Sequence, residues 1–224
     1  MNKEQDVKQV IDDLVFIKTA ISKNSNIFKF MSITDILKTF ILFSGLLIIA
    51  LSSGIYFLIG KYGDFQGIPS GVKFIVYLIL VVSVAAVGVF KTKTILGAAQ
   101  HVNRDITVGK LFKEVYTSQS LVIMLPYIFS ISMIIVFFVN NQHMEYIVPF
   151  LSIFFGLLCS SMVNIFHVKE LLVLGSWLVL SGVIALLSML SLHPLLIVNF
   201  TFGIGMLLMY VMILISSVAE KGEQ

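Results

Sequence analysis

"ELLVLGSWLVLSGVIALLSMLSLHPLLIVNFTFGIGMLLMYVMILISS", residues 170–217, consists of two long apolar runs that are joined by the short segment "SLHPLL". An α-helix needs roughly 20 predominantly apolar residues to cross the hydrocarbon core of a bilayer. The runs at about 170–192 and 195–217 both reach this length, and His193-Pro194 between them indicates a tight turn. This stretch therefore predicts two antiparallel membrane helices that lie next to each other.

The composition places the rest of the chain in the same class. Apolar residues make up 58% of the 224 residues, charged residues make up 12%, and the mean hydropathy is +1.02. An ordinary soluble domain has about a quarter of its residues charged. We therefore expect an all-α polytopic membrane helix bundle with six transmembrane helices over 38–217, preceded by a segment 1–37 and followed by a tail 218–224. The other four spans are expected at about 38–60, 73–91, 118–139 and 146–166.

The orientation of the bundle is predicted from its lysines and arginines, which accumulate in cytoplasmic loops. The positive charges gather in the N-terminal segment and in the loop between the second and third spans, at Lys3, Lys8, Lys18, Lys23, Lys29 and Lys38 and at Lys91, Lys93, Arg104, Lys110 and Lys113. The opposite loops hold only Lys61 and Lys73. We therefore expect both termini in the cytoplasm. Arg104 is the single arginine, which favours an AT-rich bacterial source. For a bacterial protein with these spans, we expect a place in the cytoplasmic (inner) membrane.

Within the N-terminal segment, residues 5–23 have the pattern of an amphipathic helix. Their apolar residues recur at steps of three and four, which builds one apolar stripe, and they are Val7, Val10, Ile11, Leu14, Ile17 and Ile21. Such a helix lies on the lipid bilayer or against the bundle, or it docks a protein partner or a second copy of the chain. No interleaving of aromatic and basic residues is present, so we expect no nucleic acid partner.

Residues with catalytic or metal-binding chemistry are sparse in the expected spans. The spans contain no Asp, Glu, Lys or Arg away from their ends, although such residues usually mark proton relays and ion pathways. No two of the four histidines have the spacing that places two metal ligands on one helix face. The single cysteine, Cys159, has no base or cation near it in the sequence. We therefore expect no catalytic, cofactor-binding or metal-binding residues and no cofactor.

The candidate residues are instead those of helix packing. Small and polar residues spaced by four allow helix backbones to approach closely and to form hydrogen bonds across the interface. They are Ser152, Gly156, Ser160 and Asn164 in the fourth span, Ser181 and Ala185 in the fifth, and Asn199 with Gly203 and Thr201 with Gly205 in the sixth. The alternative is a polar pocket in which Asn164 and Asn199 meet. In the third span, Pro126 predicts a kink.

Two further stretches resemble a family of uncharacterised bacterial six-span integral membrane proteins. Before its first span the family has a motif of the form I-R-x-x-M-E-R-S, and "FIKTAISKNSNIFKFMSITDIL" at 16–37 is similar in kind at Ile17, Lys18, Ile21 and Lys23. Serine at 22 replaces the family's glutamate. Before the fifth span, "KELLVLG" at 169–175 resembles the family's E-I-R-Y-L-G, with leucine at 172 in place of arginine. The resemblance implies six spans and a cytoplasmic N-terminal segment, and it implies no activity.

Three classes of function remain at this stage. The first is a non-enzymatic accessory or regulatory component of the membrane, which the spans free of internal charge and the amphipathic segment favour. The second is a small transporter or channel for a neutral or lipid-like substrate. The third is an enzyme acting on a lipid or a quinone. Such an enzyme would need clustered histidine, aspartate or glutamate residues, and at the expected outer surface His143 and Glu145 form the only such pair.

Overall fold

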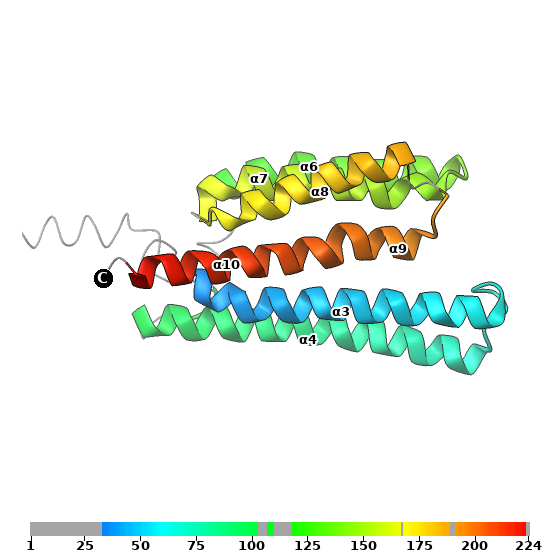
Figure 1. Ribbon diagram of the computed structural model, residues 1–224, viewed down its shortest axis with the longest axis horizontal. Coiled ribbons are helices and arrows are strands. Elements are labelled where there is room, and N and C mark those ends of the chain that lie inside the picture. The colour runs from blue at the N-terminus through cyan, green and yellow to red at the C-terminus, as the bar shows by residue number, and fades with distance from the viewer. Residues whose placement is uncertain (1–32, 103–106, 110–117, 167, 189–190, 223–224) are drawn as a thin grey trace, which may run out of the picture.

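The computed structural model describes residues 33–102, 107–109, 118–166, 168–188 and 191–222, and this part of the chain is helical without any strand (Figure 1). The elements are α3 (Ile33–Tyr62), α4 (Ser70–Val102), α6 (Ser118–Asn140), the 3₁₀ turn η1 (Met144–Tyr146), α7 (Ile147–Phe166), α8 (Glu170–Ser188), α9 (Pro194–Val198), the π-helical turn η2 (Asn199–Gly203) and α10 (Ile204–Gly222). The expected amphipathic helix at 5–23 lies outside the described residues.

The prediction of six spans is confirmed. Six helical segments are long and apolar enough to cross a membrane, and they are Lys38–Tyr62, Ser70–Thr94, Ser120–Asn140, Met144–Val163, Glu170–Ser188 and Pro194–Val218. The described part of the chain is therefore a helix bundle that is compatible with a multi-pass membrane protein. The helices and the apolar runs differ most at three ends: α3 begins at Ile33, inside the segment 1–37, α4 continues past the end of its apolar run at 91 to Val102, and α10 continues past 217 to Gly222, into the expected tail 218–224. A helix does not end where apolarity ends, because lysine, alanine and glutamine are good helix formers.

The helices form a series in which each packs mainly on its neighbours. The order of contact is α4, α3, α10, α8, α7 and α6, so α4 and α6 stand at the two ends. Figure 1 shows α10 between a layer that contains α8 and a layer that contains α3. The sixth span, built from α9, η2 and α10, is thus the element that joins the pair α3 and α4 to the group of α6, α7 and α8.

The main apolar core lies where α3, α8 and α10 meet. It consists of Ile41, Val168, Leu174, Leu178, Met209 and Ile213, each at most 5% exposed. These residues belong to the first half of α3, to the first half of α8 and the turn before it, and to the first half and middle of α10. The start of α3 and the end of α10 lie at the same end of the bundle, and this core extends from the middle of the bundle toward that end (Figure 1).

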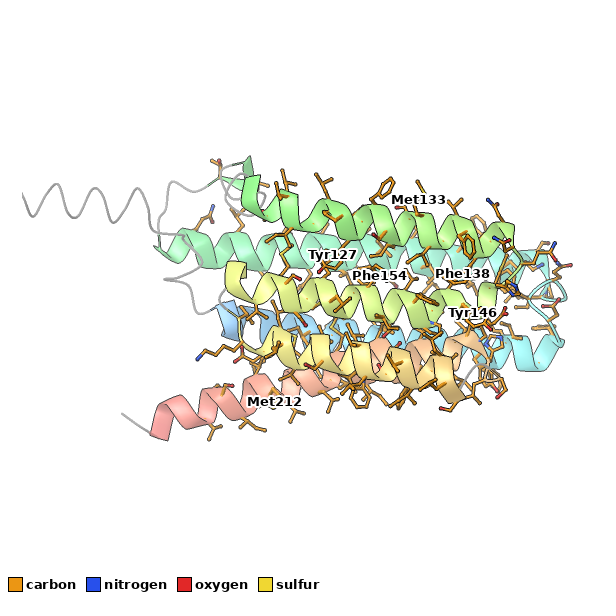
Figure 2. The ribbon with its side chains drawn as sticks, turned by 90° about the horizontal axis from the view of Figure 1, so that it is seen from above. Tyr127, Met133, Phe138, Tyr146, Phe154 and Met212 are labelled. Carbon is orange, nitrogen blue, oxygen red and sulfur yellow. The ribbon has the colours of Figure 1, made fainter. Side chains whose placement is uncertain are left out.

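Helix α6, at one end of the series, is held to α7 and to the turn η1 by aromatic and hydroxyl contacts. The hydroxyl groups of Tyr127 in α6 and Ser161 in α7 lie 2.8 Å apart and share a hydrogen bond. Near the opposite end of α6, the ring of Phe138 contacts the rings of Tyr146 and Phe150 at centroid distances of 5.6 Å and 5.2 Å. Figure 2 shows Tyr127 and Phe138 along α6. Pro126 lies inside α6, which continues as one helix from Ser118 to Asn140.

Helices α7 and α8 pack very closely, because glycines at their contact allow the two backbones to approach each other. A Cβ atom added to Gly156 would lie 2.6 Å from the carbonyl oxygen of Gly175, and one added to Gly175 would lie 2.7 Å from the carbonyl oxygen of Gly156. At Gly182, an added Cβ would lie 2.9 Å from the carbonyl oxygen of Pro149. In lipid the helices have no hydrophobic drive to associate, so such close contact is a main source of their attraction.

We expect Gly156→Ala to lower the stability of the protein, because the new methyl group meets backbone atoms that cannot move aside. Overpacking of this kind costs about 1–3 kcal/mol, which exceeds the helix-forming advantage of alanine over glycine, about 1 kcal/mol. The midpoint of thermal unfolding in detergent measures the effect. Gly88→Ala in α4 is the matched control, since nothing lies within 4 Å of its added Cβ. A midpoint for Gly156→Ala at or above that of Gly88→Ala would contradict this account.

Candidate functional site

The candidate residues of the fourth span face the fifth span. Ser152 is fully buried in α7, and its hydroxyl donates to the carbonyl oxygen of Leu178 in α8 at 2.7 Å. One turn further along, Gly156 meets Gly175, and the hydroxyl of Ser160 donates to the carbonyl oxygen of Gly156 at 3.0 Å. These three residues therefore follow the line of contact with α8. Asn164 belongs to α7, but its side chain lies outside the described part of the structure.

The candidates of the fifth span are buried in α8. Ser181 is 1% exposed, and its hydroxyl donates to the carbonyl oxygen of Leu178 at 3.3 Å. Ala185 is fully buried. The Leu178 carbonyl thus accepts hydrogen bonds from two serines, one on each helix. Cys159, on α7, is partly buried and packs against the apolar core. In this region the polar atoms bond to neighbouring backbone and leave the helices closely packed.

The two small-residue pairs of the sixth span face opposite neighbours. An added Cβ on Gly203 would lie 2.6 Å from Cγ1 of Ile49 in α3. An added Cβ on Gly205 would instead lie 2.9 Å from Cδ1 of Trp177 in α8. The pair of Asn199 and Gly203 is therefore directed at α3, and Gly205 is directed at α8. The sixth span approaches both groups of helices closely because it has small residues on both sides.

The side chain of Asn199 is bonded to α3. Its Oδ1 accepts a hydrogen bond from the hydroxyl of Ser52, and its Nδ2 donates to the hydroxyl oxygen of Ser53 at 3.0 Å. Ser52 is buried and Ser53 is exposed. Asn199 therefore bridges two helices inside the membrane, and its amide is directed at α3 rather than at the alternative partner Asn164. Ser52 and Ser53 were not among the sequence candidates, although two adjacent serines in the middle of an apolar span are a usable signal.

A π-helical turn separates the two α-helical parts of the sixth span. In η2 the backbone N–H of Ile204 donates to the carbonyl oxygens of Asn199 and Thr201, so Phe200 loses the donor that an α-helix would give its carbonyl. The indole Nε1 of Trp177 lies 3.1 Å from both the Phe200 and the Thr201 carbonyl oxygens and donates to them. A donor from α8 therefore satisfies the backbone at the point where the helix widens.

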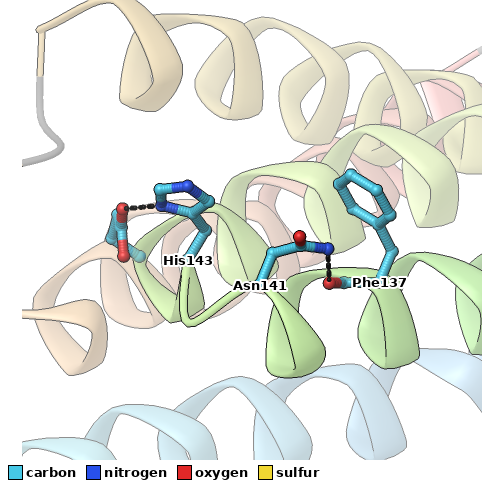
Figure 3. A network of polar contacts seen from close by, with 4 residues as sticks. Phe137, Asn141 and His143 are labelled. Atoms are coloured by element: carbon cyan, nitrogen blue, oxygen red, sulfur yellow. Dashed lines mark hydrogen bonds and ion pairs between the residues drawn. The ribbon is translucent and has the colours of Figure 1, made fainter.

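The polar groups at the other end of the bundle cap helices. The end of α6 is closed by Gln142 with a positive φ of 60° and by a hydrogen bond from the backbone N–H of His143 to the carbonyl oxygen of Phe138 at 2.9 Å. The side chain of Asn141 donates to the carbonyl oxygen of Phe137 at 2.8 Å (Figure 3). Nδ1 of His143 lies 3.2 Å from a carboxylate oxygen of Glu145, and both side chains are exposed, so this pair contributes at most about 1 kcal/mol.

His193 has a capping role at the turn between the last two spans. Its Nδ1 accepts a hydrogen bond from the backbone N–H of Leu195 at 3.3 Å, directly before Pro194 begins α9. The imidazole ring also contacts the ring of Tyr56 in α3, at a centroid distance of 5.3 Å. Within the described residues, no three histidine, cysteine, aspartate or glutamate side chains come together in a way that could hold a metal ion.

Comparison of the chain with protein-family models, with curated proteins and with solved structures finds no match.

We expect Asn199→Leu to weaken the contact between α3 and the sixth span, because it removes both hydrogen bonds of the amide while keeping a similar shape. Hydrogen bonds between membrane helices contribute about 0.6–2 kcal/mol. The free energy of unfolding in detergent should be lower in Asn199→Leu than in the wild type. Adding Ser52→Ala to Asn199→Leu should lower it by less than Ser52→Ala lowers it in the wild type. Ser132→Ala is the control, since Ser132 bonds only to the Ile128 carbonyl of its own helix at 2.9 Å. If the double variant loses as much stability as the two single variants together, the bridge between Asn199 and Ser52 is refuted.

Proposed function

We propose that the protein is a non-enzymatic accessory or regulatory component of the membrane, which acts by binding another membrane protein. The observation that carries this proposal is the exposure of the two helices at the ends of the series. In the most apolar stretch of α6 none of the residues are buried, and in that of α4 6% are, compared with 33% in α8 and in the sixth span. These helices offer most of their surface to the bilayer or to a partner.

The exposed face of α4 is suited to close contact with another helix. Ala85 and Gly88 are exposed and lie on the same side of α4, with Thr92 one turn beyond, and nothing lies within 4 Å of a Cβ added to Gly88. The hydroxyl of Thr92 donates to the Gly88 carbonyl at 2.8 Å, so this polar group is satisfied within its own helix. Small residues of this kind allow backbones to approach, whereas lipid chains gain nothing from them.

The polar side chains inside the bundle support the same proposal. Ser152, Asn199 and Trp177 each donate a hydrogen bond to a neighbouring helix. These side chains are therefore engaged in helix packing rather than in binding a substrate. Catalysis requires a nucleophile or base in reach of a second functional group. The pair of His143 and Glu145 is solvent-exposed, and its geometry is that of a surface ion pair.

A small transporter or channel for a neutral or lipid-like substrate is the second candidate. It is favoured by a groove of about 880 Å³ along the outer half of α3, lined by Ser53, Tyr56, Phe57, Ile59, Gly60, Lys61 and Gly63. Its volume is within the range of small-molecule sites, roughly 300–1,000 Å³. A substrate path would have to continue from this groove across the bundle.

We also propose that the protein lies in the bacterial cytoplasmic membrane with both termini in the cytoplasm, on its distribution of lysines. The apolar stripe of residues 5–23 would then lie on the inner membrane surface, against the bundle, or on a partner. In a Cys159→Ser background, an impermeant maleimide should label Asn141→Cys in intact spheroplasts and Lys93→Cys only after permeabilisation. Both positions are exposed. Labelling in the reverse order would overturn the orientation.

Native mass spectrometry of the protein released gently from its own membrane tests the function. We expect a stoichiometric protein partner on the wild type and its loss in Gly88→Leu, because leucine adds bulk to a face where even an added Cβ has no neighbour within 4 Å. Gly54→Leu in α3 is the matched control, since its added Cβ also has nothing within 4 Å. A chain without any protein partner would refute the accessory role, and so would equal partner loss in both variants.

A further inference from the structure

We propose that the groove along the outer half of α3 binds one anionic phospholipid, with the phosphate at Lys61 and an acyl chain against Phe57. This site is separate from the α4 face proposed for a protein partner. It rests on the shape of the groove, on the chemistry of its two ends and on the charge of Lys61.

The shape of the groove comes from small residues beside large ones. Ser53 and Gly60 lie on the lining where a larger side chain would fill the space, and a Cβ added to Gly60 would have no atom within 4 Å. Phe57, between them, is 72% exposed and forms an apolar wall. From Ser53 to Lys61 the helix rises about 12 Å, a depth that an acyl chain can occupy.

Part of the polar capacity along the groove is already used by the protein's own contacts. At the inner end, the hydroxyl oxygen of Ser53 accepts a hydrogen bond from Asn199. Tyr56, which also lines the groove, contacts the ring of His193 on one side. The middle of the groove is therefore suited to a hydrocarbon chain, and the polar head of a ligand belongs at the end of α3.

Lys61 supplies the charge at that end. It lies in the last turn of α3, it is exposed, and its described contact is with the ring of Tyr62, 5.5 Å from Nζ to the ring centroid. The nearest carboxylate in the sequence, that of Asp64, accepts a hydrogen bond from the backbone N–H of Phe65, and within the described residues no ion pair joins it to Lys61. A lysine at the membrane surface attracts anionic headgroups.

Lys73 is a natural comparison at the same end of the bundle. Its Nζ donates to the carbonyl oxygen of Gln66 at 2.9 Å and lies 5.6 Å from the centroid of the Phe65 ring. Its charge is thus engaged by the loop between α3 and α4, and it does not line the groove. General attraction of anionic lipid to this surface would involve both lysines, whereas a site in the groove requires Lys61.

The test uses the full-length protein in nanodiscs that contain equal amounts of phosphatidylglycerol and phosphatidylethanolamine, with retained lipids counted by native mass spectrometry. We expect one phosphatidylglycerol to be retained preferentially by the wild type. Lys61→Gln should reduce this retention about fivefold, the effect of one lysine at an anionic surface. Lys73→Gln should leave it unchanged.

The groove itself is tested by Gly60→Leu, which fills the space beside Phe57, with Gly54→Leu as control because residue 54 is not in the lining. We expect loss of the retained lipid in the first variant and its persistence in the second. Equal retention by wild type and Lys61→Gln would overturn the proposal. So would an equal effect of Lys73→Gln, or a lipid that persists in Gly60→Leu, since the headgroup would then bind without the groove.

Discussion

The structure depends on the sixth span fitting closely against two different neighbours at once. In a bilayer the association of helices is driven by close packing and by hydrogen bonds between them, because lipid chains are as apolar as the side chains they replace. The sixth span meets this requirement with Gly203 against Ile49 on the side of α3 and with Gly205 against Trp177 on the side of α8. Most described contacts between the pair of α3 and α4 and the other helices run through this span.

The π turn allows the same span to make polar contacts in both directions. An extra residue in the turn changes the direction in which the residues before it point, relative to those after it. Asn199 thereby reaches the serines of α3, while the carbonyl of Phe200, deprived of its helical donor, is reached by the indole of Trp177 from α8. An unsatisfied carbonyl in hydrocarbon costs several kcal/mol, so Trp177 is what makes the widened turn acceptable in this position.

The sequence was sufficient for the six spans because a helix of the required length needs a run of apolar residues that soluble proteins rarely contain. The contacts between the spans could be predicted less well from the sequence. The spacing of Gly156 and Ser160 indicated a packing surface, but no local pattern states which helix that surface meets. Asn199 has its partners 147 and 146 residues earlier in the chain, and the donor that satisfies the carbonyls of the π turn, Trp177, lies on another helix.

The distribution of polar atoms has a consequence for how such a protein can act. Inside the bundle, the hydroxyl of Ser152, the amide of Asn199 and the indole of Trp177 are engaged in contacts between helices. Under the accessory role proposed above, recognition would therefore fall to the outer surfaces. Gly88 on α4 and Gly60 on α3 lie on such surfaces, and a Cβ added to either would have no neighbour within 4 Å. A scaffold with open faces on two neighbouring helices is suited to binding other membrane components and to holding them in a fixed relation to each other.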